Sequence, residues 1–312
     1  MKRSLSRDSH LPGPAPFRSL LVPIDLTPSS DRVLGRLPLL PLAEDARVTV
    51  LHVVSSGMTS TEQRNAARDA IKSLAAEVRH QRKALPRGVT IEPLVKAGAT
   101  AKTISSYAAR MKTELVVMGR GSGSSLRDGF IGSTAERVIR QAKIPVLVVR
   151  LAPRSPYRRP ALAIALDEAA YEAIAVLLRM LPTPRSAVTV IHAFDAPYRS
   201  YFYPSLSGTT ADERRDELQL KAASEISGLL RKALARANVL PANAPAWKAH
   251  VRFGSPRTVV EQVVTRSDAD LLVLGTHGRS GAPYLLLGTV AGDLLRQSKC
   301  DVLVVPPAPS RR

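Results

Sequence analysis

Residues 271–305, LLVLGTHGRSGAPYLLLGTVAGDLLRQSKCDVLVV, decide the fold of this chain. An apolar run leads into a glycine loop, a Gly-Thr step opens a helical stretch, and a second apolar run closes the unit. Residues 115–149, LVVMGRGSGSSLRDGFIGSTAERVIRQAKIPVLVV, repeat this plan, and Gly119 lies 156 positions before its counterpart Gly275. Because that offset is the length of a whole domain, the sequence predicts a domain duplication and not a short structural repeat.

Size and composition narrow the class of protein. The chain has 312 residues, which suggests two domains. Cys300 is the only cysteine, so an internal disulfide is excluded and a reducing compartment fits. The basic N-terminal segment is not followed by an apolar stretch, and no apolar run approaches the roughly 20 residues of a spanning helix. We therefore expect a cytoplasmic protein that does not enter the membrane.

Short apolar runs alternate with helical stretches in both halves, which is typical of a parallel sheet covered on both faces. The predicted strands are 19–24, 48–53, 90–95 and 145–149 in the first half and 161–166, 187–192, 246–251 and 301–305 in the second, besides the runs before each glycine loop. We predict two tandem open five-stranded parallel sheets of the nucleotide-binding, Rossmann-like α/β class, with strand order 3-2-1-4-5. The last strands, 145–149 and 301–305, would be exposed apolar edges, so we expect them to pair within the chain. Further pairing into a homodimer stays open.

The predicted domains are 18–150 and 160–306. Residues 1–17 and 307–312 form tails, and the proline- and arginine-rich stretch 151–159 reads as an exposed linker. The second half also carries an insertion between its second and third strands, for which the aromatic-rich stretch 195–215 is the candidate. A loop this long is commonly functional or disordered.

Polar residues and glycines follow the first and fourth strands of each half. Asp25 and Asp167 end the first strands, and Gly119 and Gly275 end the fourth. If these strands are neighbours, each pair lies in one crevice at the carboxyl ends of the sheet, where such folds bind ligands. The helix that follows begins with Gly-Ser or Gly-Thr, and a helix N-terminus suits an anion. The arrangement predicts a mononucleotide site.

Two other phosphate-binding motifs are missing from the sequence. Nothing matches the P-loop pattern G-x-x-x-x-G-K-[ST], and no G-x-G-x-x-G follows a first strand. These absences disfavour P-loop enzymes and nicotinamide or flavin dehydrogenases.

The combined pattern resembles the universal stress protein family in a tandem form. It consists of V-x-x-D after the first strand, G-x-x-G separated by nine residues from G-[ST], and a closing PVLVV. The resemblance implies binding of ATP, with or without Mg²⁺, or of another adenine nucleotide in some members. It implies these nucleotide-binding positions: Pro23, Asp25, Met118, Gly119, Gly132 and Ser133 in the first half, and Asp167, Leu274, Gly275, Gly278, Gly288 and Thr289 in the second.

The two halves depart from this pattern in different places. The first half has Ser122 where the motif has its second glycine, although Gly121 and Gly123 flank it. The second half keeps its glycines but has no match to Pro23. We therefore treat the chain as carrying two candidate sites with separate prospects.

Some of the candidate residues also have plausible structural roles. Asp25 and Asp167 are also good helix caps, and His52 and His192, at matching places in apolar strands, are predicted as hydrogen-bonded core residues rather than metal ligands. The sequence shows no metal-ligand spacing and no catalytic constellation, so we expect at most a slow ATPase. The net charge of +19 leaves one alternative, a basic module for nucleic acid or protein, against which the scarcity of aromatics counts.

Overall fold

A computed structural model describes residues 14–28, 30–55, 57, 59–121, 133–183, 185–194, 209–276 and 288–307. The first half contains β1 (Phe17–Pro23), α1 (Ser30–Arg36), η1 (Leu37–Leu39), β2 (Leu42–Val54), α2 (Ser60–Arg82), β3 (Thr90–Ala97), α3 (Thr100–Arg110), β4 (Leu115–Gly119), α4 (Ser133–Gln141) and β5 (Val146–Val149). The second contains β6 (Pro160–Ala163), α5 (Ala169–Met180), β7 (Ala187–Phe194), α6 (Thr209–Arg236), η4 (Pro241–Asn243), β8 (Ala246–Phe253), α7 (Pro256–Arg266), β9 (Leu271–Gly275), α8 (Thr289–Gln297) and β10 (Asp301–Val305). Strands and helices alternate in each half, as the apolar pattern predicts.

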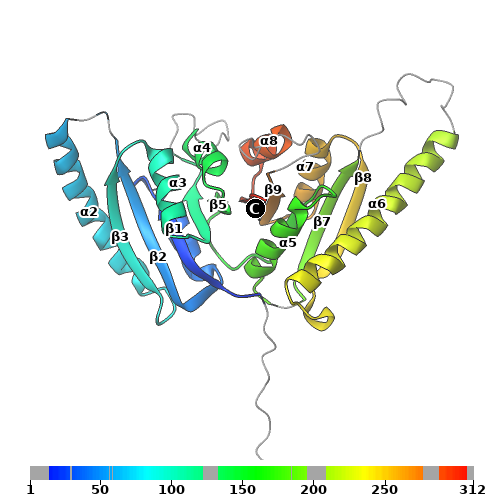
Figure 1. The fold of residues 1–312 in the computed structure, drawn as a ribbon, viewed down its shortest axis with the longest axis horizontal. Helices are drawn as coiled ribbons and strands as arrows, with labels where there is room; N and C mark the ends of the chain where they lie inside the picture. Colours follow the sequence, from blue (N-terminus) through cyan, green and yellow to red (C-terminus); the bar gives the residue numbers. More distant parts are fainter. Residues whose placement is uncertain are drawn as a thin grey trace, which may run out of the picture.

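The strands form one ten-stranded sheet in the order β3-β2-β1-β4-β5-β10-β9-β6-β7-β8. Within each half every described pairing is parallel, and the order 3-2-1-4-5 is confirmed twice. The halves join where β5 and β10 pair antiparallel, with Leu147 opposite Leu303. The last strands therefore pair within the chain, and the two halves spread from this joint as two wings (Figure 1).

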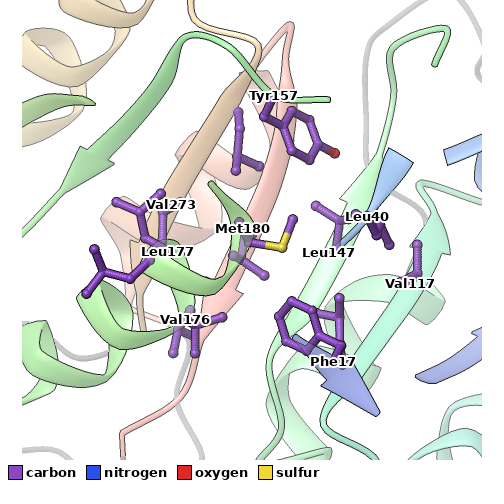
Figure 2. Close-up of a cluster of buried hydrophobic side chains, with 14 of the residues drawn as sticks. Phe17, Leu40, Val117, Leu147, Tyr157, Val176, Leu177, Met180 and Val273 are labelled. Atoms are coloured by element: carbon purple, nitrogen blue, oxygen red, sulfur yellow. The ribbon is translucent and has the colours of Figure 1, made fainter. Parts of the chain in front are cut away.

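Two hydrophobic cores lie on opposite faces of the sheet, as the absence of a polar face in the strands predicts. One core lies under α1, α2, α5 and α6, and the other under α3, α4, α7 and α8. The first core runs across the joint, because it includes both Leu147 and Leu303. Figure 2 shows this region, where Phe17, Leu147 and Met180 approach one another from the two halves. The halves thus share buried apolar surface as well as strand hydrogen bonds.

A buried polar cluster closes the joint on one side. Asp301 is 0% exposed and accepts hydrogen bonds from the backbone N–H groups of Arg150 (2.7 Å) and Leu151 (2.8 Å) and from the Tyr157 hydroxyl (2.6 Å). The Arg36 guanidinium lies 3.2 Å from the same carboxylate. We call these five residues the Asp301 junction. Its members come from α1, the segment 150–157 that follows β5, and β10, so it fastens the two halves to each other.

The junction corrects part of the prediction that 151–159 is an exposed linker, because Ala152, Arg154, Arg158 and Arg159 are exposed but Tyr157 is not. Tyr157 is only 2% exposed. The backbone N–H groups of Arg158 and Arg159 donate to the Asp270 carboxylate at 2.8 and 3.0 Å. Prolines and arginines predict solvent exposure on average, but here the segment's backbone donors find carboxylates of the second half.

The insertion is also partly different from its prediction. Residues 209–215 are helical and form the start of α6, so the predicted loop 195–215 extends too far. Its aromatic part, 195–208, lies outside the described residues. The helix α6 has 28 residues, against 23 in the corresponding α2, so added helix accounts for part of the extra length.

Helix α2 begins at a capping box. The Thr59 side chain accepts from the Glu62 backbone N–H at 3.3 Å, and the Glu62 carboxylate accepts from the Thr59 backbone N–H at 2.8 Å. These bonds satisfy two donors that a helix start leaves open. Within the described ranges, no helix is both long enough and apolar enough to cross a membrane.

Candidate functional site

A cavity of about 240 Å³ lies in the first half, at the carboxyl ends of β1 and β4. Four residues predicted for nucleotide binding line it together: Pro23, Asp25, Met118 and Gly119. They meet because β1 and β4 are parallel neighbours, with Leu20 opposite Leu115. The predicted crevice is therefore present in the fold.

The carboxylate of Asp25 is held at the wall of this cavity. Its Oδ1 accepts hydrogen bonds from the Thr27 backbone N–H (3.2 Å), the Thr27 hydroxyl (2.7 Å) and the Ser30 hydroxyl (2.9 Å). Ser30 is the first residue of α1. Asp25 thus organises the turn into α1, as the helix-cap alternative predicts, and lines the cavity at the same time.

Three helix starts face the cavity. Ser30 opens α1, Thr100 opens α3 and Thr134 lies in the first turn of α4, and all three line it. The first N–H groups of a helix have no partner within it and carry partial positive charge. The cavity is therefore suited to a negatively charged group.

Sequence analysis assigned only the start of α4 to this site. Ser30 and Thr100 were missed, although each opens a helix that follows a strand of the same parallel sheet. Once the strand order is known, such helix starts must lie at the same edge. That topological rule is the signal by which they could have been found.

The glycine loop leaves β4 through Gly119 and Gly121. A Cβ added at Gly119 would lie 3.4 Å from Val33 of α1, so glycine permits close packing there. Gly121, which also lines the cavity, has φ of +89°, a left-handed conformation that favours glycine. Gly132 and the side chain of Ser133 lie outside the described residues.

His52 lines the same cavity. The hydrogen bonds predicted for both strand histidines are present, and His192 is a buried core residue as predicted, whereas His52 is only partly buried. The Nδ1 atom of His52 lies 3.0 Å from the Ile24 carbonyl oxygen, and Nδ1 of His192 lies 3.0 Å from that of Ile164. Because a carbonyl only accepts, Nδ1 donates in both residues, and Nε2 of a neutral ring is left as an acceptor. Across the described ranges no group of His, Cys, Asp and Glu is arranged to hold a metal ion.

The second half places its predicted residues at the corresponding edge. Leu274 pairs with Ala163 of β6, so Gly275 and the segment containing Asp167 follow neighbouring parallel strands. The Asp167 carboxylate accepts from the Ala169 backbone N–H at 3.1 Å, again at a helix start. Gly278 lies outside the described residues.

The start of α8 is tied to the end of β9. The Gly288 backbone N–H donates to the Thr276 carbonyl at 3.4 Å, and Thr289 is the first helical residue. A Cβ at Gly288 would lie 3.8 Å from that carbonyl oxygen, and one at Gly275 would meet no atom of the described residues within 4 Å. Gly288 has φ of −55°, which any residue adopts. Neither strain nor crowding by the described residues explains these glycines.

The fold, with a cavity at the carboxyl ends of the first-half strands and the corresponding residues at the same edge of the second half, defines a tandem, open α/β protein. Two consecutive stretches, residues 16–150 and 156–306, match the universal stress protein family, and the chain belongs to that family.

The similar proteins agree with this assignment. A universal stress protein of Mycolicibacterium smegmatis is 24% identical over 312 aligned positions, covering 92% of this chain and 97% of its own. A universal stress protein structure from Archaeoglobus fulgidus has a TM-score of 0.62 at 16% identity and covers 94% of this chain and 98% of its own.

Proposed function

We propose that this tandem universal stress protein binds ATP or a related adenine nucleotide at the carboxyl ends of its strands. It would act as a nucleotide-responsive regulator in a stress response and not as a metabolic enzyme. The observation that carries the proposal is the first-half cavity, where Pro23, Asp25, Met118 and Gly119 come together beside the start of α4.

The chemistry of the cavity wall matches the parts of a nucleotide. Val33, Ile104 and Met118 supply apolar surface for a base. Asp25 is an acceptor suited to ribose hydroxyl groups, or to Mg²⁺ through water. The start of α4 and the glycine loop offer backbone N–H groups to phosphates. The cavity of about 240 Å³ is smaller than the roughly 300–1,000 Å³ of most small-molecule sites, so we expect it to enclose the base and ribose while the phosphates extend toward the start of α4.

The second half would bind in the same way through Asp167, Leu274, Gly275, Gly278, Gly288 and Thr289. Gly275 and Gly288, which the described residues do not crowd, support this proposal. The two sites differ in sequence, so we expect them to differ in affinity.

We expect at most slow hydrolysis of the bound nucleotide. Phosphoryl transfer needs a positioned nucleophile and stabilisation of developing charge. Among the described residues that line the first cavity, Asp25 is the single carboxylate, and its Oδ1 already accepts three hydrogen bonds. We expect binding, with hydrolysis incidental.

The test begins with protein purified without added ligand. Denaturation followed by mass spectrometry identifies released nucleotide, and its amount per chain counts the occupied sites. If neither released nor added ATP binds at millimolar concentration, the proposal is wrong.

A matched pair of variants assigns the sites. Thr134→Glu and Val290→Glu place a carboxylate at the same position of α4 and α8, in the first turn of each helix. A carboxylate there stabilises a helix start but repels phosphate, so each variant should remain folded and lose nucleotide from its own half. Gly288→Val should abolish binding in the second half alone. If ATP affinity is unchanged in the double variant, the phosphates do not lie at these helix starts.

The salt dependence of binding distinguishes this proposal from the alternative, a basic module for nucleic acid. Nucleic-acid affinity carried by phosphate contacts falls steeply with ionic strength. Strong binding that persists in the presence of saturating ATP would favour the alternative.

A further inference from the structure

A second and larger cavity, of about 610 Å³, lies at the opposite end of the second half. It is bounded by α7, α8, the stretch 151–159 and the amino ends of β9 and β10. The candidate nucleotide crevices lie at the carboxyl ends of the strands, so this cavity is separate from them. Its volume falls within the range of about 300–1,000 Å³ that small-molecule sites occupy.

The floor of this cavity is apolar. Leu151, Val264 of α7 and Ala269 line it and are only partly buried, so they present apolar surface to it, above the fully buried Val260, Leu272 of β9 and Leu294 of α8. Cys300, 3% exposed, completes the floor beside them. Surface of this kind favours a ligand with an apolar body.

The rim of the cavity is charged, but most of its charges are already paired. Arg159 lies 3.0 Å from the Asp268 carboxylate, and Glu261 lies 3.3 Å from Arg257. The Asp270 carboxylate accepts the backbone N–H groups of Arg158 and Arg159. These pairs leave the acidic groups of the rim partly neutralised.

Three donors of the lining remain available, one from α7 and two from the end of α8 and the segment after it. Lys299 lines it and forms no hydrogen bond or ion pair with any described residue. Gln297 uses its amide oxygen to accept from Arg257 at 2.6 Å, which leaves its amide N–H groups available. The Thr265 hydroxyl, also on the rim, likewise has no side-chain hydrogen bond within the described ranges. Ammonium, amide and hydroxyl donors above an apolar floor match a carboxylate attached to an apolar body.

We propose that this cavity binds an organic carboxylate whose apolar body lies on Leu151, Val264 and Ala269 and whose carboxylate pairs with Lys299. The proposal does not depend on nucleotide binding. The first half gives a matched reference, because Lys143 occupies the position of Lys299, while Ala109 stands in place of Thr265 and Ile144 in place of Cys300.

Two fluorescent probes with the same apolar body test the charge preference. Pyrenebutyrate carries a carboxylate and pyrenebutanol a neutral hydroxyl, and both are titrated into the full chain. We expect the wild type to prefer the carboxylate. Lys299→Met should reduce that preference by up to about fivefold, the range for an exposed ion pair, whereas Lys143→Met should leave it unchanged. Equal binding of the two probes, or equal effects of the two lysine variants, would overturn the proposal.

The location is tested through Cys300, the only cysteine of the chain. Bound pyrenebutyrate should slow alkylation of Cys300 by iodoacetamide at pH 9 at least severalfold. Thr265→Trp, a substitution at an exposed position on α7, should narrow the cavity and weaken both probes while circular dichroism stays unchanged. Saturating probe that leaves the alkylation rate unaltered would show that it binds elsewhere.

Discussion

Replacing Asp301 with alanine is the most direct test of how the two halves are joined. The carboxylate is fully buried and accepts three hydrogen bonds, and the Arg36 guanidinium beside it is 4% exposed. Asp301→Ala leaves that cation buried without a counterion. Removing one partner of such a pair destabilises proteins by about 3–5 kcal/mol, a large share of the roughly 5–15 kcal/mol that keeps a domain folded.

The measurement is urea unfolding followed by circular dichroism, with the free energy of unfolding from linear extrapolation. The control is Glu168→Ala, which breaks an ion pair whose side chains, Arg236 and Glu168, are 58% and 81% exposed. That variant should lose no more than about 1 kcal/mol. Asp301→Asn keeps an acceptor and should fall between the two.

A second substitution separates the stranded charge from the lost hydrogen bonds. Arg36→Met in the Asp301→Ala background removes the buried cation, so part of the lost stability should return. A loss below about 1 kcal/mol for Asp301→Ala, or an Arg36→Met effect that simply adds to it, would refute the reasoning.

Three further outcomes are expected. Burial and the nearby Asp301 raise the pKa of Tyr157 well above 10. Its contribution to stability is therefore complete below pH 10 and is lost above it, where only the unfolded tyrosine ionises. In urea unfolding at alkaline pH, the free energy of unfolding of Tyr157→Phe should decline less steeply than that of the wild type, by up to about 1.4 kcal/mol per pH unit. Burial, with the Asp301 charge, raises the pKa of the Cys300 thiol to about 12, so alkylation should be slow and rise about tenfold per pH unit from 8 to 10; a plateau near pH 9 would contradict this. Hydrogen bonds from Thr59 lower the pKa of Glu62 in the folded protein. The stabilising effect of Glu62 on α2 is therefore present above the pKa that Glu62 has in the unfolded chain, and it is lost as the pH falls through the pKa in the folded protein. NMR titration of Thr59→Ala should find the pKa of Glu62 raised.

The strand order could be predicted because the residues that follow two strands can form one site only if those strands are neighbours in the sheet. Asp25 and Gly119 make sense as a pair only if β1 and β4 are neighbours, and they are. The histidines followed from a similar argument, since a polar ring in a buried strand needs a partner, and each finds the carbonyl of a residue beside the first strand.

The Asp301 junction could not be predicted, because it depends on contacts between segments far apart in the chain. In the first half the position of Asp301 is Pro145, so the repeat gives no hint of a buried carboxylate there. Tyr157 lies in a stretch whose composition indicates exposure, and only the position of β10 against β5 explains its burial. Local composition could not indicate where the partner would lie.

The pairing of β5 with β10 has a consequence for assembly. An obligate dimer built through its last strands would have a stability that falls on dilution, since mass action governs its association. Here the partner strand belongs to the same polypeptide, so the joint should persist at any concentration. The described sheet ends instead at β3, interrupted by Pro93, and at β8, whose Lys248 and Arg252 discourage another strand. Any homodimer of this protein should therefore form through helices, leaving the sheet at ten strands.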